Sequence, residues 1–231
     1  VVDPRPYAEI LRQWSTLHPE FAFLPRKFKI AITGAKEDRA AIGWHDVGLQ
    51  LVKNTNGEVG FKIWVGGGMG RTPIIGTLVR EFLPWQHIMN YLEAVVRVYN
   101  RWGRRDNLYK ARIKILVKAE GQRYIDEVEA EFEDVVNKDG GPHTISQAEF
   151  DRVAACFVEP PAPAYTAASD QSKLQDPAFQ RWLHQNVAPH KNPTLRAVSL
   201  SFKRLGLAPG DATAEQLEAS AQLVAKYSRG E

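Results

Sequence analysis

Residues 47–65 read VGLQLVKNTNGEVGFKIWV, and this stretch decides the fold. Apolar residues recur at every second position on both sides of Asn56-Gly57, a period that indicates half-buried strands. An Asn-Gly pair between two such runs is a strong signal for a β-hairpin. The sequence therefore predicts two antiparallel strands near 46–53 and 58–66.

Upstream of the hairpin, the sequence predicts one helix and one further strand. Beyond Pro25, apolar residues again recur at every second position through 27–33, which indicates a strand with lysines on its other face. Closer to the start, Pro4 suits the first turn of a helix over 4–14. The apolar residues at helical spacing in that segment are Tyr7, Ile10, Leu11 and Trp14.

Downstream of Pro84 the pattern becomes helical. Apolar spacings of three and four predict helices over 84–103, 124–132 and 145–157. Residues 107–118 fit a strand as well as a helix, and we favour the helix. Together these patterns predict an α+β fold, in which a mixed or antiparallel sheet is covered by helices from 84 to 135.

The C-terminal part of the chain differs in composition. The proline-rich segment 159–164 predicts a stiff linker, so we divide the chain into 1–158, a linker with a short helix over 159–192, and 193–231. Alternation over 198–202 predicts a strand, and Thr213 predicts the cap of a helix that begins at Ala214. One strand and one helix cannot close a core, so we expect this last unit to be incomplete.

Composition excludes several classes of protein. The 231 residues are 44% hydrophobic and 25% charged, as in ordinary globular domains, and a net charge of +3 does not by itself indicate nucleic acid. No apolar run approaches the roughly 18 residues that span a bilayer, so we expect no membrane partner. The chain opens at Val1 without an apolar leader, from which we expect an interior piece of a cytoplasmic protein.

Three basic residues within positions 26–29 form the first candidate site. Lys27 and Lys29 project from one strand face about 7 Å apart, and Arg26 precedes them. Neighbouring ammonium groups repel one another unless water or a shared anion lies between them. The pair is therefore either a solvated strand face or an anion site.

A glycine-rich loop is the second candidate. Glycines let the backbone approach a ligand closely and expose N–H groups to an anion. The loop lacks the Lys-Ser or Lys-Thr of a P-loop, and Pro73 interrupts the helix that a dinucleotide fingerprint requires. A glycine-rich hairpin is the alternative. The candidate residues are Gly66, Gly67, Gly68, Met69, Gly70 and Arg71.

Opposite charges are segregated along the helical region. Residues 97–118 contain eight cations and one acid, and residues 119–134 contain seven acids and one cation. We predict two helix faces that attract one another. The alternative is a non-catalytic module that binds an anion or nucleic acid through 97–118, although aromatic residues are not interleaved there for base stacking.

The cysteine and the histidines form no recognisable catalytic or metal-binding motif. The single cysteine, Cys156, excludes an internal disulfide, and its apolar neighbours predict a buried, unreactive thiol. Five of the six histidines lack the spacing of metal ligands, so we expect no metal site among these five. These histidines are His45, His87, His143, His184 and His190.

Three motifs, taken in this order, resemble the sulfite and nitrite reductase haemoprotein family. They are LPRKFKIA at 24–31, VGGGMGRTP at 65–73 and YNRWGRRDN at 99–107. The resemblance covers about 7–157 and implies a sirohaem-binding half-domain over 1–158. It resumes at 193–231, where residues 208–213 are similar to the opening of the family's second ferredoxin-like repeat.

The resemblance implies an enzyme that reduces sulfite to sulfide, or nitrite to ammonia, with six electrons at a sirohaem coupled to a 4Fe-4S cluster. It implies that Lys27 and Lys29 are cofactor-binding residues that face the distal side of the sirohaem. There they would hold the anionic substrate and assist proton delivery as the S–O or N–O bond breaks. Arg26, Arg112 and the loop 66–71 are implied to face the macrocycle, whose eight carboxylates suit guanidinium and backbone donors.

The family holds its cluster with four cysteines, so the resemblance implies that these ligands are absent from this chain and lie beyond Glu231. We therefore expect the 231-residue chain alone to be inactive, because part of the cofactor machinery is missing. The implied electron donor is a ferredoxin or a flavoprotein. A stable interaction domain without catalysis is a third interpretation.

Overall fold

The computed structural model describes residues 2–158, 171–190, 192–203, 206, 208 and 210–228. The chain divides into two compact units, Val1–Pro161 and Ala162–Glu231. The linker predicted over 159–164 lies outside the described residues. No helix within the described part of the chain is both long and apolar enough to cross a membrane.

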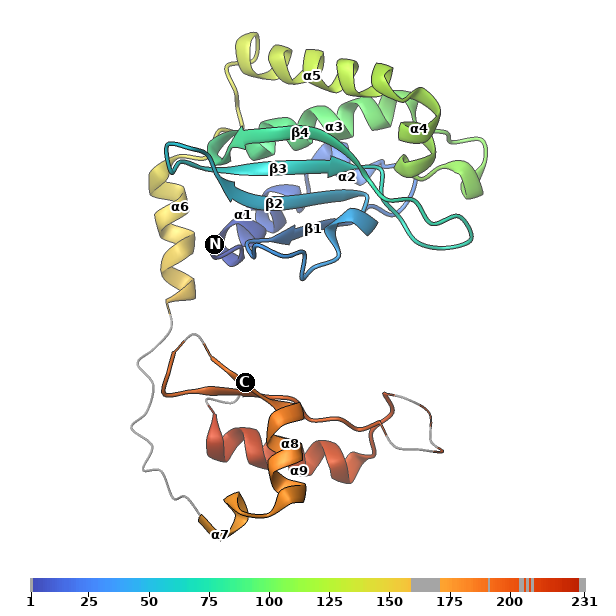
Figure 1. Ribbon diagram of the computed structural model, residues 1–231. Helices are drawn as coiled ribbons and strands as arrows, with labels where there is room; N and C mark the ends of the chain where they lie inside the picture. Colours follow the sequence, from blue (N-terminus) through green and yellow to red (C-terminus); the bar gives the residue numbers. More distant parts are fainter. Residues whose placement is uncertain are drawn as a thin grey trace. The chain divides into compact units, whose positions relative to one another are not determined.

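The first unit is built on a four-stranded sheet in the order β1-β2-β3-β4 (Figure 1). Strands β2 (Val47–Lys53) and β3 (Val59–Val65) pair antiparallel, which confirms the predicted hairpin. Strand β4 (Thr77–Pro84) adds antiparallel to β3, whereas β1 (Ile30–Thr33) runs parallel to β2. The sheet is therefore mixed, and the predicted α+β class is confirmed.

Two strands differ from the sequence prediction. Strand β1 begins at Ile30 rather than near 27, because the N–H of Lys29 is bound by Oδ2 of Asp46 at 3.0 Å instead of by a strand partner. Strand β4 has no counterpart in the prediction. Its register against β3 shifts twice between Phe61 and Trp64, and such irregularity obscures the period-two pattern.

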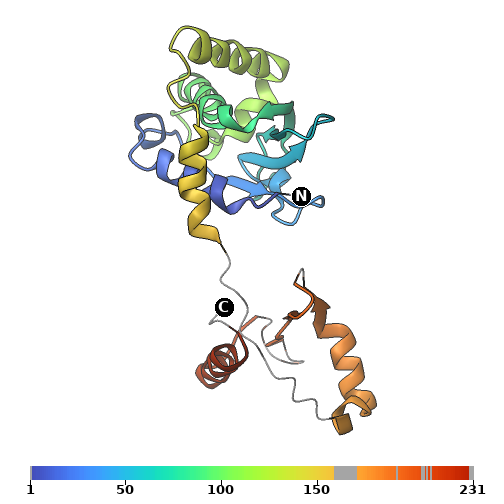
Figure 2. The ribbon, with the colours of Figure 1, turned by 90° about the vertical axis from the view of Figure 1, so that its left-hand side faces the viewer.

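Helices complete the first unit, and the central one is α3 (Ile88–Trp102), which lies between the sheet and α5 (Gln122–Asn137) (Figures 1 and 2). Ten of its fifteen residues are buried, and its polar residues Asn90, Glu93, Arg97 and Arg101 follow one stripe of the helix. The remaining helices are α1 (Arg5–Ser15), α2 (Pro19–Ala22), α4 (Ile113–Glu120) and α6 (Gln147–Ala154). Short 3₁₀ turns lie at Ile42–Trp44, Trp85–His87, Leu108–Lys110 and Ala155–Phe157.

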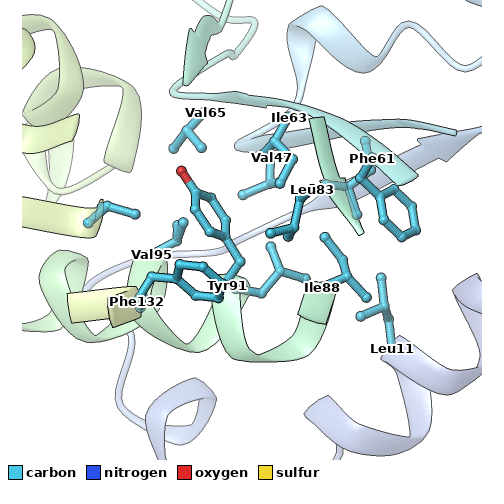
Figure 3. Packing of buried hydrophobic residues seen from close by; sticks show 14 of the residues in the cluster. Leu11, Val47, Phe61, Ile63, Val65, Leu83, Ile88, Tyr91, Val95 and Phe132 are labelled. Atoms are coloured by element: carbon cyan, nitrogen blue, oxygen red, sulfur yellow. The ribbon is translucent and has the colours of Figure 1, made fainter. Parts of the chain in front are cut away.

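The helices predicted in the first unit all form, but the predicted start at Pro84 is wrong. Pro84 ends β4, a 3₁₀ turn follows, and α3 begins at Ile88. The ambiguous segment 107–118 contains a 3₁₀ turn followed by the start of α4, so the preference for helix there is confirmed. Figure 3 shows Tyr91 of α3 pointing toward Val65 of the sheet, and Phe132 of α5 packs against Tyr91 with ring centroids 5.2 Å apart. Burial of one large apolar side chain contributes about 1.5–3 kcal/mol, so this layer of contacts holds the helices to the sheet.

The second unit contains short elements. They are α7 (Gln171–Leu174), α8 (Pro177–Asn186), β5 (Val187–Pro189), β6 (Arg196–Val198) and α9 (Ala214–Tyr227). Strands β5 and β6 form an antiparallel hairpin. No residue of this unit whose burial is described is buried.

The predicted cap of α9 is present. The hydroxyl of Thr213 accepts from the N–H of Gln216 at 3.2 Å, and the Gln216 side chain accepts from the N–H of Thr213 at 2.9 Å. The strand predicted over 198–202 was placed too late, since β6 ends at Val198. Its partner β5 starts only at Val187, where α8 has just ended, and this limits the length of the pair.

Candidate functional site

A hollow of about 920 Å³ lies at the end of the sheet where β2 begins and β3 ends. We call it the cationic hollow, because seven of the described residues that line it are basic and none of those residues is acidic. Like charges collected around one space favour an anion there. The basic residues are Arg26, Lys27, Lys29, Arg71, Lys110, Arg112 and Lys114.

An extended segment before β1 brings three of these cations to the hollow. Lys27 and Lys29 are exposed and line the hollow, while Phe28 between them is half-buried against the core. The alternation predicted for a strand therefore persists, although the residues precede β1. Arg26 also lines the hollow, and its guanidinium donates to the backbone oxygen of Leu108.

A buried carboxylate, Asp46, joins three segments beneath the hollow. Its Oδ1 accepts from the Arg112 guanidinium at 2.7 and 3.2 Å, and its Oδ2 accepts from the N–H of Lys29 at 3.0 Å. Its backbone oxygen accepts from the N–H of Gly66 at 2.9 Å. Asp46 is 0% exposed, so its charge is held by these donors rather than by water. The role of Asp46 was not predicted from the sequence, because a single aspartate before a strand belongs to no recognisable motif.

The glycine-rich loop is the turn between β3 and β4, and only part of it lines the hollow. Met69, Gly70 and Arg71 line the hollow, whereas the glycines 66–68 are buried and lie outside its wall. The backbones of Gly68 and Ile74 exchange two hydrogen bonds of 2.9 Å, as the hairpin alternative expects.

Gly66 explains why the loop needs glycine at its base. Its φ of +87° lies in the left-handed region, and a Cβ there would lie 2.8 Å from Cβ of Val117 in α4. A larger residue would separate the loop from the helix. The first glycines therefore let the loop pack closely onto α4.

Lys114 ties the same loop to α4 from the other side. Its Nζ donates to the backbone oxygens of Met69 at 3.0 Å and Thr72 at 2.6 Å. Burial, followed by the nearby charge of Arg112, lowers the pKa of Lys114. Because its ammonium is already bound by carbonyls, Lys114 holds the shape of the wall.

The third motif of the resemblance, residues 99–107, secures the segment that carries the lysines. Asn100 donates to the backbone oxygen of Glu20 at 2.8 Å, and Arg105 donates to that of Phe23 at 2.8 Å. The motif therefore acts on the hollow through the backbone that leads into Lys27 and Lys29.

The segregated charges pair with each other as predicted. Arg97 donates to Glu93 at 2.9 Å and to Glu131 at 3.0 Å, and Arg101 lies 2.7 Å from Glu131. The two pairs with Glu131 join α3 to α5. Since basic groups of 97–118 are bound inside the fold, the nucleic-acid alternative is not favoured.

Two residues depart from the sequence prediction. His45 lines the hollow, with Nδ1 2.8 Å from the backbone oxygen of Ala41. Its spacing from other residues in the sequence did not indicate a functional site. Cys156 is exposed, so the prediction of a buried thiol is wrong. The helical period that placed it inside ends with α6 at Ala154, and a 3₁₀ turn follows.

The fold and the hollow together define an α+β domain with a concave, strongly basic site at one end of its sheet. The family model described as nitrite and sulphite reductase 4Fe-4S domain matches residues 1–135, and the chain belongs to this family. The predicted family resemblance is thereby confirmed, and with it an oxidoreductase family of iron–sulfur proteins.

Two curated relatives and one solved structure are similar to part of the chain. The chain is 32% identical over 133 residues to sulfite reductase (ferredoxin) 1 of Mycolicibacterium paratuberculosis, covering 57% of this chain and 24% of that protein. It is 30% identical over 112 residues to the sulfite reductase (NADPH) hemoprotein beta-component of Staphylococcus epidermidis, covering 46% and 19%. The solved structure of Mycobacterium tuberculosis NirA protein aligns with 31% identity and a TM-score of 0.47, covering 55% of this chain and 22% of that chain. The chain thus spans about a quarter or less of the length of these proteins.

Proposed function

We propose that the cationic hollow is one wall of a sirohaem and substrate site in a reductase of the sulfite or nitrite type, formed by residues 1–158. The observation that carries the proposal is the set of seven cations around one space, with no acid among the described lining residues. Family membership and the names of the relatives support it. The activity would belong to a larger protein of which this chain supplies a part.

The residues present fit a macrocycle that carries many carboxylates. The carboxylate of Asp46 is buried and is already bound by Arg112 of the wall. The wall therefore presents positive charge to an incoming polyanion. Arg71 offers a guanidinium group, which can bind a carboxylate with two parallel hydrogen bonds. Arg26 and Arg112 keep further N–H donors besides those that bind Leu108 and Asp46. When bound, sirohaem supplies the iron at which the anion is reduced.

Lys27 and Lys29 are the residues proposed to act on the substrate. Reduction of sulfite to sulfide takes up six electrons and six protons and releases three water molecules. Two exposed ammonium groups beside the hollow can hold the anion and deliver protons from Nζ as oxygen leaves. Either sulfite or nitrite would be held by the same charges.

Binding of an octacarboxylate porphyrin tests the proposal. Uroporphyrin is titrated into the full 231-residue chain and followed by fluorescence anisotropy at low and high salt. The double variant Lys27→Gln/Lys29→Gln should weaken binding by roughly tenfold, as expected for two partly solvated ion pairs. Lys53→Gln is the matched control, because Lys53 is an exposed lysine at the far end of β2. Equal affinity of the wild type and the double variant would contradict the proposed wall.

The chain alone is proposed to lack catalysis. A 4Fe-4S cluster requires four ligands, which are cysteine thiolates in most proteins, and the sequence contains one cysteine. Sirohaem and a chemical reductant should therefore produce no sulfide with this chain. Measurable sulfide production would show that this part of the proposal is wrong. The electron donor proposed for the whole protein is a ferredoxin or a flavoprotein.

A further inference from the structure

Glu93 is a buried carboxylate in the middle of α3, and one of its oxygens lacks a donor. Oε1 accepts from Nε of Arg97 at 2.9 Å. The side chain is 3% exposed, and Oε2 has no hydrogen-bond partner in the part of the chain that the structure describes. A buried carboxylate oxygen without a donor is costly, so Oε2 favours a further donor or cation besides Arg97.

Two imidazoles face this oxygen from segments far apart in the sequence. Nε2 of His18 lies 3.0 Å from Oε2 of Glu93, and Nε2 of His143 lies 4.0 Å from it. Neither contact has the geometry of a hydrogen bond. Ligand atoms of the three residues all lie within 4.8 Å of one another. Sequence spacing could not indicate this cluster, because its members come from three separate elements.

The cluster is held in place by its supporting residues. The N–H of His143 donates to Oδ1 of Asn90 at 2.9 Å, and Asn90 lies one helical turn before Glu93 on α3. The Trp14 ring packs on both imidazoles, with ring centroids 5.0 Å from His18 and 5.6 Å from His143. One face of the cluster is therefore apolar and shielded from water.

We propose that His18, Glu93 and His143 bind one divalent transition-metal ion of the Zn²⁺ type. Two imidazoles and a carboxylate suit Zn²⁺, and bonds of about 2.0–2.1 Å place tetrahedral donors roughly 3.3 Å apart. The observed 3.0 and 4.0 Å lie on either side of that value. His143 is 26% exposed, which leaves a side from which the ion and a water ligand can enter. None of the three is among the described residues that line the cationic hollow, so this site is separate from the proposed reductase site.

Binding rearranges one hydrogen bond of His18. Its Nδ1 accepts from the N–H of Glu20 at 3.3 Å, a long contact at the start of α2. A neutral imidazole that binds a metal through Nε2 carries its proton on Nδ1, so this contact is lost. Metal uptake should therefore shift the amide resonance of Glu20.

Calorimetric titration of the full 231-residue chain with ZnCl₂, repeated with CoCl₂, tests the proposal. The wild type should bind one ion per chain, and bound Co²⁺ should show the intense visible absorption of a four-coordinate site. His143→Gln should lower the affinity by at least about tenfold, the loss that even outer-sphere changes produce at metal sites. His184→Gln is the matched control, because His184 is an exposed histidine on α8 of the other unit, and it should bind as the wild type does.

Either of two results of these titrations would contradict the proposed metal site. Failure of the wild type to bind Zn²⁺ or Co²⁺, or equal affinities of His143→Gln and His184→Gln, would overturn the proposal and leave a His18–Glu93 ion pair. His143 lies in a partly exposed loop, so the His143→Gln variant should fold as the wild type does. Thermal unfolding of both metal-free proteins tests this. His18→Gln provides a second variant with the same expected loss.

Discussion

Replacement of Asp46 with asparagine should loosen two sides of the cationic hollow together. The carboxylate accepts from the Arg112 guanidinium with one oxygen and from the N–H of Lys29 with the other. An amide of the same shape keeps only one acceptor. Its NH₂ group must then face either the guanidinium or the backbone N–H, and both of these are donors.

The expected loss follows from burial. Removing one partner of a buried charge pair costs about 3–5 kcal/mol, because the other charge stays uncompensated. Asp46 is 0% exposed, but the Arg112 side chain is 17% exposed and water can replace part of what is lost. We therefore expect Asp46→Asn to lower the free energy of unfolding by about 3 kcal/mol. For a chain of this size that corresponds to a fall in Tm of roughly 6–12 °C.

Urea denaturation of both proteins, followed by circular dichroism, measures this loss. Asp126→Asn is the matched control, because Asp126 is exposed on α5 and its replacement should change the free energy by no more than about 0.5 kcal/mol. Uroporphyrin binding should weaken in Asp46→Asn, since both Arg112 and the Lys29 segment lose their anchor. A loss below about 1 kcal/mol would refute the claim that this carboxylate holds the wall.

Three further perturbations test other contacts. Gly66→Ala should destabilise the chain by about 1–3 kcal/mol more than Gly140→Ala. Both glycines have positive φ, but of the two only Gly66 has no room for a Cβ. Urea denaturation of both variants measures the difference. Lys114→Met removes the clamp on the glycine-rich loop and should speed tryptic cleavage after Arg71 by roughly tenfold, measured by mass spectrometry; an unchanged rate would show that the clamp is dispensable. Burial raises the pKa of Tyr99 to about 12, so the unfolded chain releases this proton near pH 10 while the folded chain keeps it. Stability should therefore fall as pH rises from about 10 to 12, with tyrosinate absorbance rising as the chain unfolds.

Much of the fold is predictable from local pattern. The β2–β3 hairpin follows from alternation around Asn56-Gly57, and the cap of α9 follows from Thr213 with Gln216 three residues later. Strand β4 is not predictable in this way, because its bulged register breaks the alternation. Where the apolar period of a segment agrees with its strand pairing, the sequence alone predicts the strand. Where a bulge interrupts the pairing, the strand is defined only by its hydrogen bonds to the neighbouring strand.

The site is predictable only in part. Lys27, Lys29 and the basic end of the loop can be proposed from their spacing and from family resemblance. Asp46 cannot, because its role depends on Arg112, a residue 66 positions away. The cluster of His18, Glu93 and His143 is hidden for the same reason, since tertiary packing alone brings its members together.

The strand order of the first unit has a consequence for the time course of folding. Every pairing in its sheet joins strands that are consecutive in the chain, so only short loops must close to build it. The β2–β3 hairpin can form first and the other strands can add to it. The hollow, by contrast, requires Asp46 to meet Arg112 across 66 residues. We expect a chain emerging from the ribosome to hold a nearly complete sheet before its basic wall closes.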